Sequence, residues 1–109
     1  MQELLQLEGV ARLFEVLSDK NRLVILQCLK DQPYAVGELV ERSKLSQPMV
    51  SKHLATLYEA GLLNRARRKV NVIYSIKEPL VFQLCDLVCE KLFQDAQNQL
   101  QIFGRGAAS

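Results

Sequence analysis

The side chains with the most distinctive chemistry in this sequence are three cysteines, Cys28, Cys85 and Cys89. Cys85 and Cys89 are four positions apart, so they share one face of any helix that contains them. Two thiolates at that spacing can bind one soft ion between them. A disulfide between them would be strained, because their Cβ atoms would lie about 5–6 Å apart. The alternative is structural, since free cysteine commonly packs as a small buried hydrophobe.

A second feature is a cluster of four cations within five residues, formed by Arg65, Arg67, Arg68 and Lys69. The formal net charge is only +2, so the positive charge is concentrated here. Such a cluster repels itself and adds nothing to folding, but it gains free energy against a phosphate backbone by releasing counterions. Taken alone a charge run is typical of solvated surface, so its role depends on the elements around it.

A third feature is a polar run that begins at Ser46. Ser46 is a good N-cap, and Pro48 suits the first turn of a helix because it has no N–H to leave unpaired. The residues that we expect to point outward from this helix are Gln47, Ser51 and Lys52, with His53 beside them. The residues that we expect to point inward are Val50 and Leu54. Amide, hydroxyl and ammonium groups at the start of a helix can pair with base edges in the DNA major groove.

Hydrophobic periodicity indicates the elements that position these residues. The expected helices span residues 2–17, 20–30, 36–43, 46–60 and 78–101. Gly61 ends the fourth helix, and two-residue alternation begins soon after it. This change of period predicts a two-stranded hairpin with Leu62 and Leu63 at its start, Val70 to Ser75 as its second strand and 67–69 as its basic tip.

This order predicts a mostly α fold with a small β-hairpin, the winged helix-turn-helix. Two short helices joined by a turn form the helix-turn-helix, and the hairpin behind them forms the wing. Residues 1–103 would form one domain, followed by a flexible tail at 104–109. The first and last helices carry apolar stripes that a chain of 109 residues has little core to cover. We therefore expect a homodimer formed through the N- and C-terminal helices.

The stretch from Leu13 to Ile76 resembles the ArsR/SmtB family of bacterial winged-helix sensor repressors. The segments that carry the resemblance are 14–23, 36–39, 45–54, 60–63 and 72–76, and the most specific reads Ser46-Gln47-Pro48…Ser51-Lys52-His53-Leu54. The resemblance implies a homodimer on a double-stranded, inverted-repeat DNA operator, from which an effector releases it. The expected DNA contacts are Ser46, Gln47, Pro48, Met49, Ser51, Lys52, His53, Arg65, Arg67, Arg68 and Lys69.

The family's usual sensing positions are changed in this sequence. Segment 36–39 reads Val-Gly-Glu-Leu where many arsenic and lead sensors have a Cys-x-Cys pair. The last helix also lacks the histidines that zinc and nickel sensors use, because the single histidine is His53. The resemblance therefore points to Cys85 and Cys89 as a site for arsenite or another thiophilic ion. A thiol or persulfide redox switch that uses Cys28 with Cys85 or Cys89 stays open as the alternative.

Other classes of function are disfavoured. The single histidine and the lack of a Cys-x-x-Cys motif or glycine-rich phosphate loop leave no catalytic set to assign, so we expect neither an enzyme nor a required cofactor. A winged-helix module that binds proteins rather than DNA is a further alternative, which the basic wing disfavours. No apolar run approaches about 18 residues, and the acidic N-terminus is unlike a signal peptide. We therefore expect no membrane partner and a cytoplasmic location.

Overall fold

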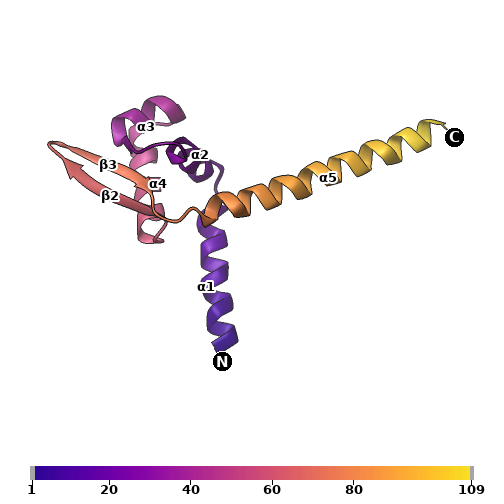
Figure 1. Cartoon of the computed structure of the whole chain (residues 1–109), viewed down its shortest axis with the longest axis horizontal. Coiled ribbons are helices and arrows are strands. Elements are labelled where there is room, and N and C mark those ends of the chain that lie inside the picture. The colour runs from indigo at the N-terminus through magenta and orange to yellow at the C-terminus, as the bar shows by residue number, and fades with distance from the viewer. Residues whose placement is uncertain (1, 109) are drawn as a thin grey trace. The chain divides into compact units, whose positions relative to one another are not determined.

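The computed structural model describes residues 2–108, and within that range it contains five helices and three strands (Figure 1). The helices are α1 (Gln2–Leu17), α2 (Lys20–Leu29), α3 (Val36–Ser43), α4 (Gln47–Glu59) and α5 (Leu80–Ala108). The strands are β1 (Tyr34–Ala35), β2 (Leu63–Arg68) and β3 (Asn71–Ile76). The chain divides into two compact units, Met1–Glu78 and Pro79–Ser109, and each is described by itself.

The helix-turn-helix consists of α3 and α4, and its turn follows the local chemistry of the sequence. Lys44 ends α3 in the left-handed conformation with φ of 62°. Ser46 is the N-cap of α4, and its hydroxyl accepts a hydrogen bond from the backbone N–H of Met49 at 3.4 Å. Gly61, with φ of 80°, follows the C-cap of α4 at the position where glycine relieves backbone strain. The predicted span of 46–60 agrees with the observed helix to within one residue at each end, where Ser46 and Ala60 are the caps.

The start of α2 is fixed by Asp19. Its carboxylate accepts hydrogen bonds from the backbone N–H groups of Asn21 at 2.8 Å and Arg22 at 3.1 Å. These are two of the N–H groups that have no partner inside the helix. The backbone hydrogen bond from Arg22 is the largest cause that lowers the pKa of Asp19, and the second bond, His53 and the Arg22 charge add to it. The charged carboxylate therefore suits the N-terminus of α2.

The sheet has three antiparallel strands in the order β1-β3-β2, so the predicted two-stranded hairpin was incomplete. β2 and β3 form the hairpin, with Leu63 opposite Ile76 at its base and Arg68 opposite Asn71 at its tip. β1 adds two residues to the outer edge of β3, with Tyr34 opposite Tyr74. A strand of two residues is too short to give an alternating pattern, which is why the sequence did not predict it.

The core of the first unit lies between α2, α3, α4 and the sheet. Its apolar residues are almost fully buried: Ile25, Leu26, Leu29, Leu39, Val50, Leu54, Leu57, Leu62 and Leu63, with Tyr34 and Tyr74 from the sheet. The middle helices thus use their apolar faces for packing, and the start of α4 is left at the surface.

Helix α5 makes up the second unit and continues to Ala108, beyond the predicted end near residue 101. Its bounds include residues 104–108 of the expected flexible tail, whose flexibility stays a prediction, while Ser109 lies outside the described residues. Long apolar side chains of α5 are exposed in the single chain, including Leu92 and Phe93. Helix α1 likewise exposes Leu4, Leu7 and Phe14. Exposed apolar patches of this kind mark interaction surfaces.

Candidate nucleic-acid interface and thiol pair

The N-terminal end of α4 presents polar groups to solvent. The exposed residues there are Ser46, Gln47, Pro48, Met49, Ser51 and Lys52. Val50 and Leu54 are fully buried on the other side, so the predicted inward residues are confirmed. The N-terminus of a helix also carries a partial positive charge and unpaired N–H groups, which favour phosphate. This end of α4 can therefore enter a DNA groove while its other face holds it on the domain.

His53 does not point outward with this polar set, and the prediction of its orientation was wrong. Its side chain is buried, with 8% exposed. His53 follows Val50 by three residues and precedes Leu57 by four, so it belongs to the packed face of α4. Its Nδ1 lies 3.5 Å from Nη1 of Arg22, and its Nε2 lies 3.9 Å from Oδ1 of Asp19. The spacing from Val50 was the sequence signal that could have placed it correctly.

The wing differs from the prediction in where its tip lies. Arg67 and Arg68 belong to β2, and the loop contains two residues, Lys69 and Val70. Lys69 has φ of 58°, the sign that a two-residue hairpin loop requires at its first position. Val70 is 90% exposed at the tip. Arg67 and Arg68 alternate along the strand, so the wing presents cations on both of its faces.

Arg65 occupies a different place from the other cations of the cluster. It lies further down β2, opposite Tyr74, and its guanidinium carbon is 4.0 Å from the centre of the Tyr58 ring. Tyr58 belongs to the C-terminal half of α4. This cation–π contact connects the base of the wing to the helix whose start carries the polar set. The base of the wing is thus attached to the C-terminal half of the helix whose other end carries the polar set.

The three cysteines are free thiols with different exposure. Cys28 and Cys85 are half-buried, and Cys89 is exposed. Burial raises the pKa of the Cys85 thiol, and the neighbouring Cys89 and Asp86 raise it further. Among residues 2–108 no group of three or more histidine, cysteine, aspartate or glutamate side chains is placed to hold a metal ion. The described part of the chain therefore has two thiols on α5 and no complete metal site of its own.

The sequence and the fold both match known regulators. Residues 19–65 match the family described as bacterial regulatory protein, arsR family. The transcriptional activator HlyU of Vibrio cholerae is 36% identical over 76 residues, which cover 70% of each chain. This protein belongs to the ArsR family. The regulator YgaV of Escherichia coli is 37% identical and is covered over 87% of its length. A probable mercury resistance operon repressor of Streptomyces lividans is 36% identical, with 62% of its length covered.

Solved structures share the fold of this ArsR-family protein. NolR from Sinorhizobium fredii has a TM-score of 0.76 and 27% identity, covering 82% of this chain and 89% of that one. Reduced HlyU from Vibrio cholerae has a TM-score of 0.69 and 32% identity, covering 81% and 94%. A domain from Mycobacterium bovis described as a winged helix-turn-helix also matches, with a TM-score of 0.75, so the predicted winged helix-turn-helix is confirmed. Because its relatives are transcriptional regulators, the ArsR-family protein is a regulator rather than an enzyme.

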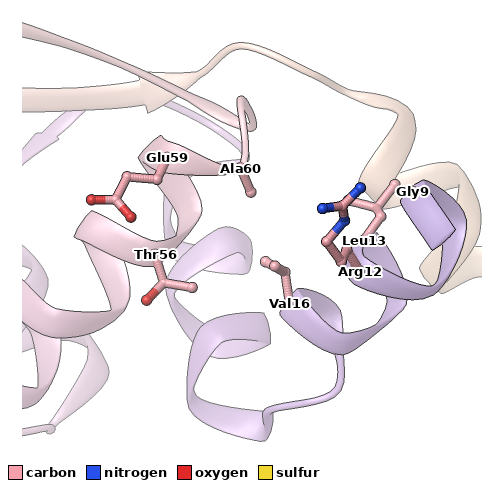
Figure 2. Close-up of a pocket in the computed structure, with 7 residues that line it drawn as sticks. All are labelled: Gly9, Arg12, Leu13, Val16, Thr56, Glu59 and Ala60. Carbon is pink, nitrogen blue, oxygen red and sulfur yellow. The ribbon is translucent and has the colours of Figure 1, made fainter. Parts of the chain in front are cut away.

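Two further features complete the description of the ArsR-family regulator. A pocket of about 410 Å³ lies between α1 and α4, with Arg12, Leu13 and Val16 on one side and Glu59 and Ala60 on the other (Figure 2). Its lining is mainly apolar and contains neither cysteine nor histidine. Within residues 2–108, no helix combines the length and the apolarity that a membrane span would need.

Proposed function

We propose that this ArsR-family regulator is a homodimeric repressor that binds an inverted-repeat operator and is released when a thiophilic ion, such as arsenite, binds Cys85 and Cys89. The observation that carries the DNA-binding part is that one compact unit exposes both the polar start of α4 and a cationic wing, whose base contacts the C-terminal half of α4. A repressor of this kind acts where the chromosome is, so we place it in the cytoplasm. It needs no cofactor to bind DNA in this proposal.

Base contacts and phosphate contacts are divided between α4 and the wing. Gln47, Ser51 and Lys52 have the donors and acceptors that read base edges, and they are exposed on α4. Ser46, Pro48 and Met49 lie at the same end and would approach the groove wall. Arg67, Arg68 and Lys69 would hold phosphates, which position the protein without carrying sequence information. We leave the buried His53 out of this contact set.

The homodimer would use the exposed apolar faces of α1 and α5. Leu7 on α1 and Phe93 on α5 are each 61% exposed in the single chain. A winged helix-turn-helix domain from Mycobacterium bovis, with a TM-score of 0.75 and 24% identity, is described as homodimeric. An inverted-repeat operator matches the two-fold symmetry of such a dimer.

The proposed effector acts at the thiols of α5. Cys85 and Cys89 are four residues apart on one helix, so a soft ion can bridge them. Each thiol gives up its proton when it binds the ion, and the raised pKa of Cys85 leaves less thiolate available for this step at neutral pH. The relative from Streptomyces lividans is described as a mercury resistance repressor, which supports a thiophilic effector.

Thiol oxidation is the second candidate signal. HlyU from Vibrio cholerae, at 32% identity, has been solved in a form described as reduced. In this chain an oxidation product would use Cys28 with Cys85 or Cys89. A peroxide or a persulfide, and not an ion, would then release the protein from its operator.

The deciding experiment measures binding to a fluorescein-labelled duplex from upstream of the protein's own gene by fluorescence anisotropy. Reduced protein is compared alone, with sodium arsenite, and with hydrogen peroxide or a persulfide donor. We expect arsenite to release the duplex from the wild type and not from the Cys85→Ser/Cys89→Ser variant. If only the oxidant releases the duplex, and Cys28→Ser abolishes that release, the signal is thiol oxidation and not a bound ion. No binding to the duplex would favour a winged-helix module that binds protein.

A further inference from the structure

Arg22 connects the end of α1 to α4. Its Nε donates a hydrogen bond to the carbonyl oxygen of Val16 at 2.6 Å, and its Nη2 donates to the carbonyl oxygen of Glu15 at 3.2 Å. Both carbonyls belong to the last turn of α1, where the helix's regular hydrogen bonds run out and a cation is favoured. The remaining nitrogen, Nη1, lies 3.5 Å from Nδ1 of His53 on α4. One planar guanidinium therefore contacts two helices.

His53 completes this connection from the side of α4. When the proton is on Nε2, Nδ1 can accept the hydrogen bond from Arg22, and the Nε2–H is directed toward the Asp19 carboxylate at 3.9 Å. Asp19 in turn caps α2. The buried imidazole thus lies where groups from α1, α2 and α4 meet, on the same helix whose exposed start carries the polar set.

Direct packing between α1 and α4 is interrupted near this point. The pocket in Figure 2 lies between the two helices, and the side chain of Val16 lines it while the backbone of Val16 accepts the bond from Arg22. An open space carries less mechanical constraint than close-packed side chains. Beside this pocket, the hydrogen-bonded connection through Arg22 and His53 joins the two helices.

We propose that Arg22 and His53 form a strut through which the end of α1 sets the position of α4, so that operator affinity depends on the state of α1. The inference rests on the proposed function, in which α1 contributes to the dimer and α4 reads the operator. In this role His53 is a positioning residue and makes no contact with DNA. A change at the dimer face could then reach the DNA-reading helix within one unit of the chain.

The test compares His53→Leu, which fills the site but removes both ring nitrogens, with His53→Asn, which keeps an acceptor near the position of Nδ1. Affinity is measured on the upstream duplex and on a scrambled duplex across a range of salt. We expect His53→Leu to lose operator affinity about tenfold. The slope of affinity against salt should not change, because no phosphate contact is lost. His53→Asn should recover most of the lost affinity.

A double-mutant cycle with Arg22→Met separates a strut from general destabilisation. The strut requires that the double variant bind the operator about as well as His53→Leu alone. Additive losses, an unchanged affinity of His53→Leu, or a failure of His53→Asn to improve on it would each overturn the strut. If His53→Leu does not fold, Arg22→Lys is measured in its place, because it keeps the charge but loses the planar fork. The strut then requires that Arg22→Lys lose operator affinity, and an unchanged affinity would overturn it. If the wild-type protein does not bind the upstream duplex, the proposed function and this inference are both overturned.

Discussion

At the scale of single residues, Cys85 and Cys89 should differ in reactivity even though they share a helix face. Cys89 is exposed, whereas burial raises the pKa of Cys85 and lowers its thiolate fraction at neutral pH. We expect iodoacetamide at pH 7.5 to alkylate Cys89 several-fold faster than Cys85, measured by mass spectrometry of tryptic peptides. Raising the pH should narrow the difference between the two alkylation rates, because more of the Cys85 thiol is then deprotonated. Faster labelling of Cys85 at neutral pH would contradict this order.

Asp19 should make the stability of the first unit depend on acid. Its pKa is lowered in the folded chain, first by the backbone hydrogen bond from Arg22. The stabilisation is therefore fully present above the ordinary aspartate pKa of 3.8 and is lost as the pH falls through the lower folded value. Asp19→Asn keeps a good cap but removes the charge. Urea unfolding from pH 6 to pH 2 should show a smaller acid loss for this variant than for the wild type.

The outcome at His53 shows what residue-level prediction could and could not achieve. The sequence identified the polar start of α4 correctly, because Ser46 and Pro48 fix where the helix begins. His53 was assigned to the outward set by its polarity, although its spacing from Val50 and Leu57 placed it on the buried face. Its partners Arg22 and Asp19 come from another helix, and no local pattern predicts such a contact.

At the scale of elements, the wing should act both through its charges and through its attachment to α4. Tyr58→Leu removes the ring face beneath Arg65. An exposed cation–π contact contributes about 0.5–1 kcal/mol, so we expect about a two- to fivefold loss of DNA affinity. The salt slope should stay unchanged in this variant, and Tyr58→Phe should bind like the wild type because it keeps an aromatic face.

Arg68→Ala serves as the contrasting change on the same wing. A lost phosphate contact weakens binding to all sequences alike and reduces the salt slope by about one. Affinity for the upstream duplex and for a scrambled duplex, each titrated in salt, distinguishes the two roles. If Tyr58→Leu flattened the slope as much as Arg68→Ala, Arg65 would have to be counted among the phosphate contacts.

The elements themselves were largely predictable, since caps and periodicity are local. Ser46, Gly61 and the alternation after it gave α4 and the hairpin to within a few residues. The tip of the hairpin was misplaced because Lys69 supplies a positive φ without the glycine or asparagine that normally signals such a loop. The short strand β1 forms only by pairing with β3, a contact between distant segments that periodicity cannot indicate.

At the scale of the whole molecule, the two units of the chain have different requirements. In the first unit α2, α3, α4 and the sheet bury their apolar residues in a core, whereas α5, like α1, exposes apolar side chains along its length. The apolar stripes of the first and last helices were visible in the sequence. The effector site could not be predicted as firmly from the sequence. Two thiols on α5 do not complete a metal site within the described part of one chain.

Dimerisation through α5 is therefore the property on which the proposed repressor depends most. Leu92 is exposed in the single chain and would be buried between copies, so Leu92→Asp would place an unpaired charge in the interface. We expect the dissociation constant of the dimer to rise on the order of 100-fold. Analytical ultracentrifugation measures it. Operator affinity should fall in parallel and recover at high protein concentration. Gln97→Asp adds the same charge at an exposed polar position of α5 and is the matched control. A Leu92→Asp protein that stayed dimeric at nanomolar concentration would move the interface away from this face of α5.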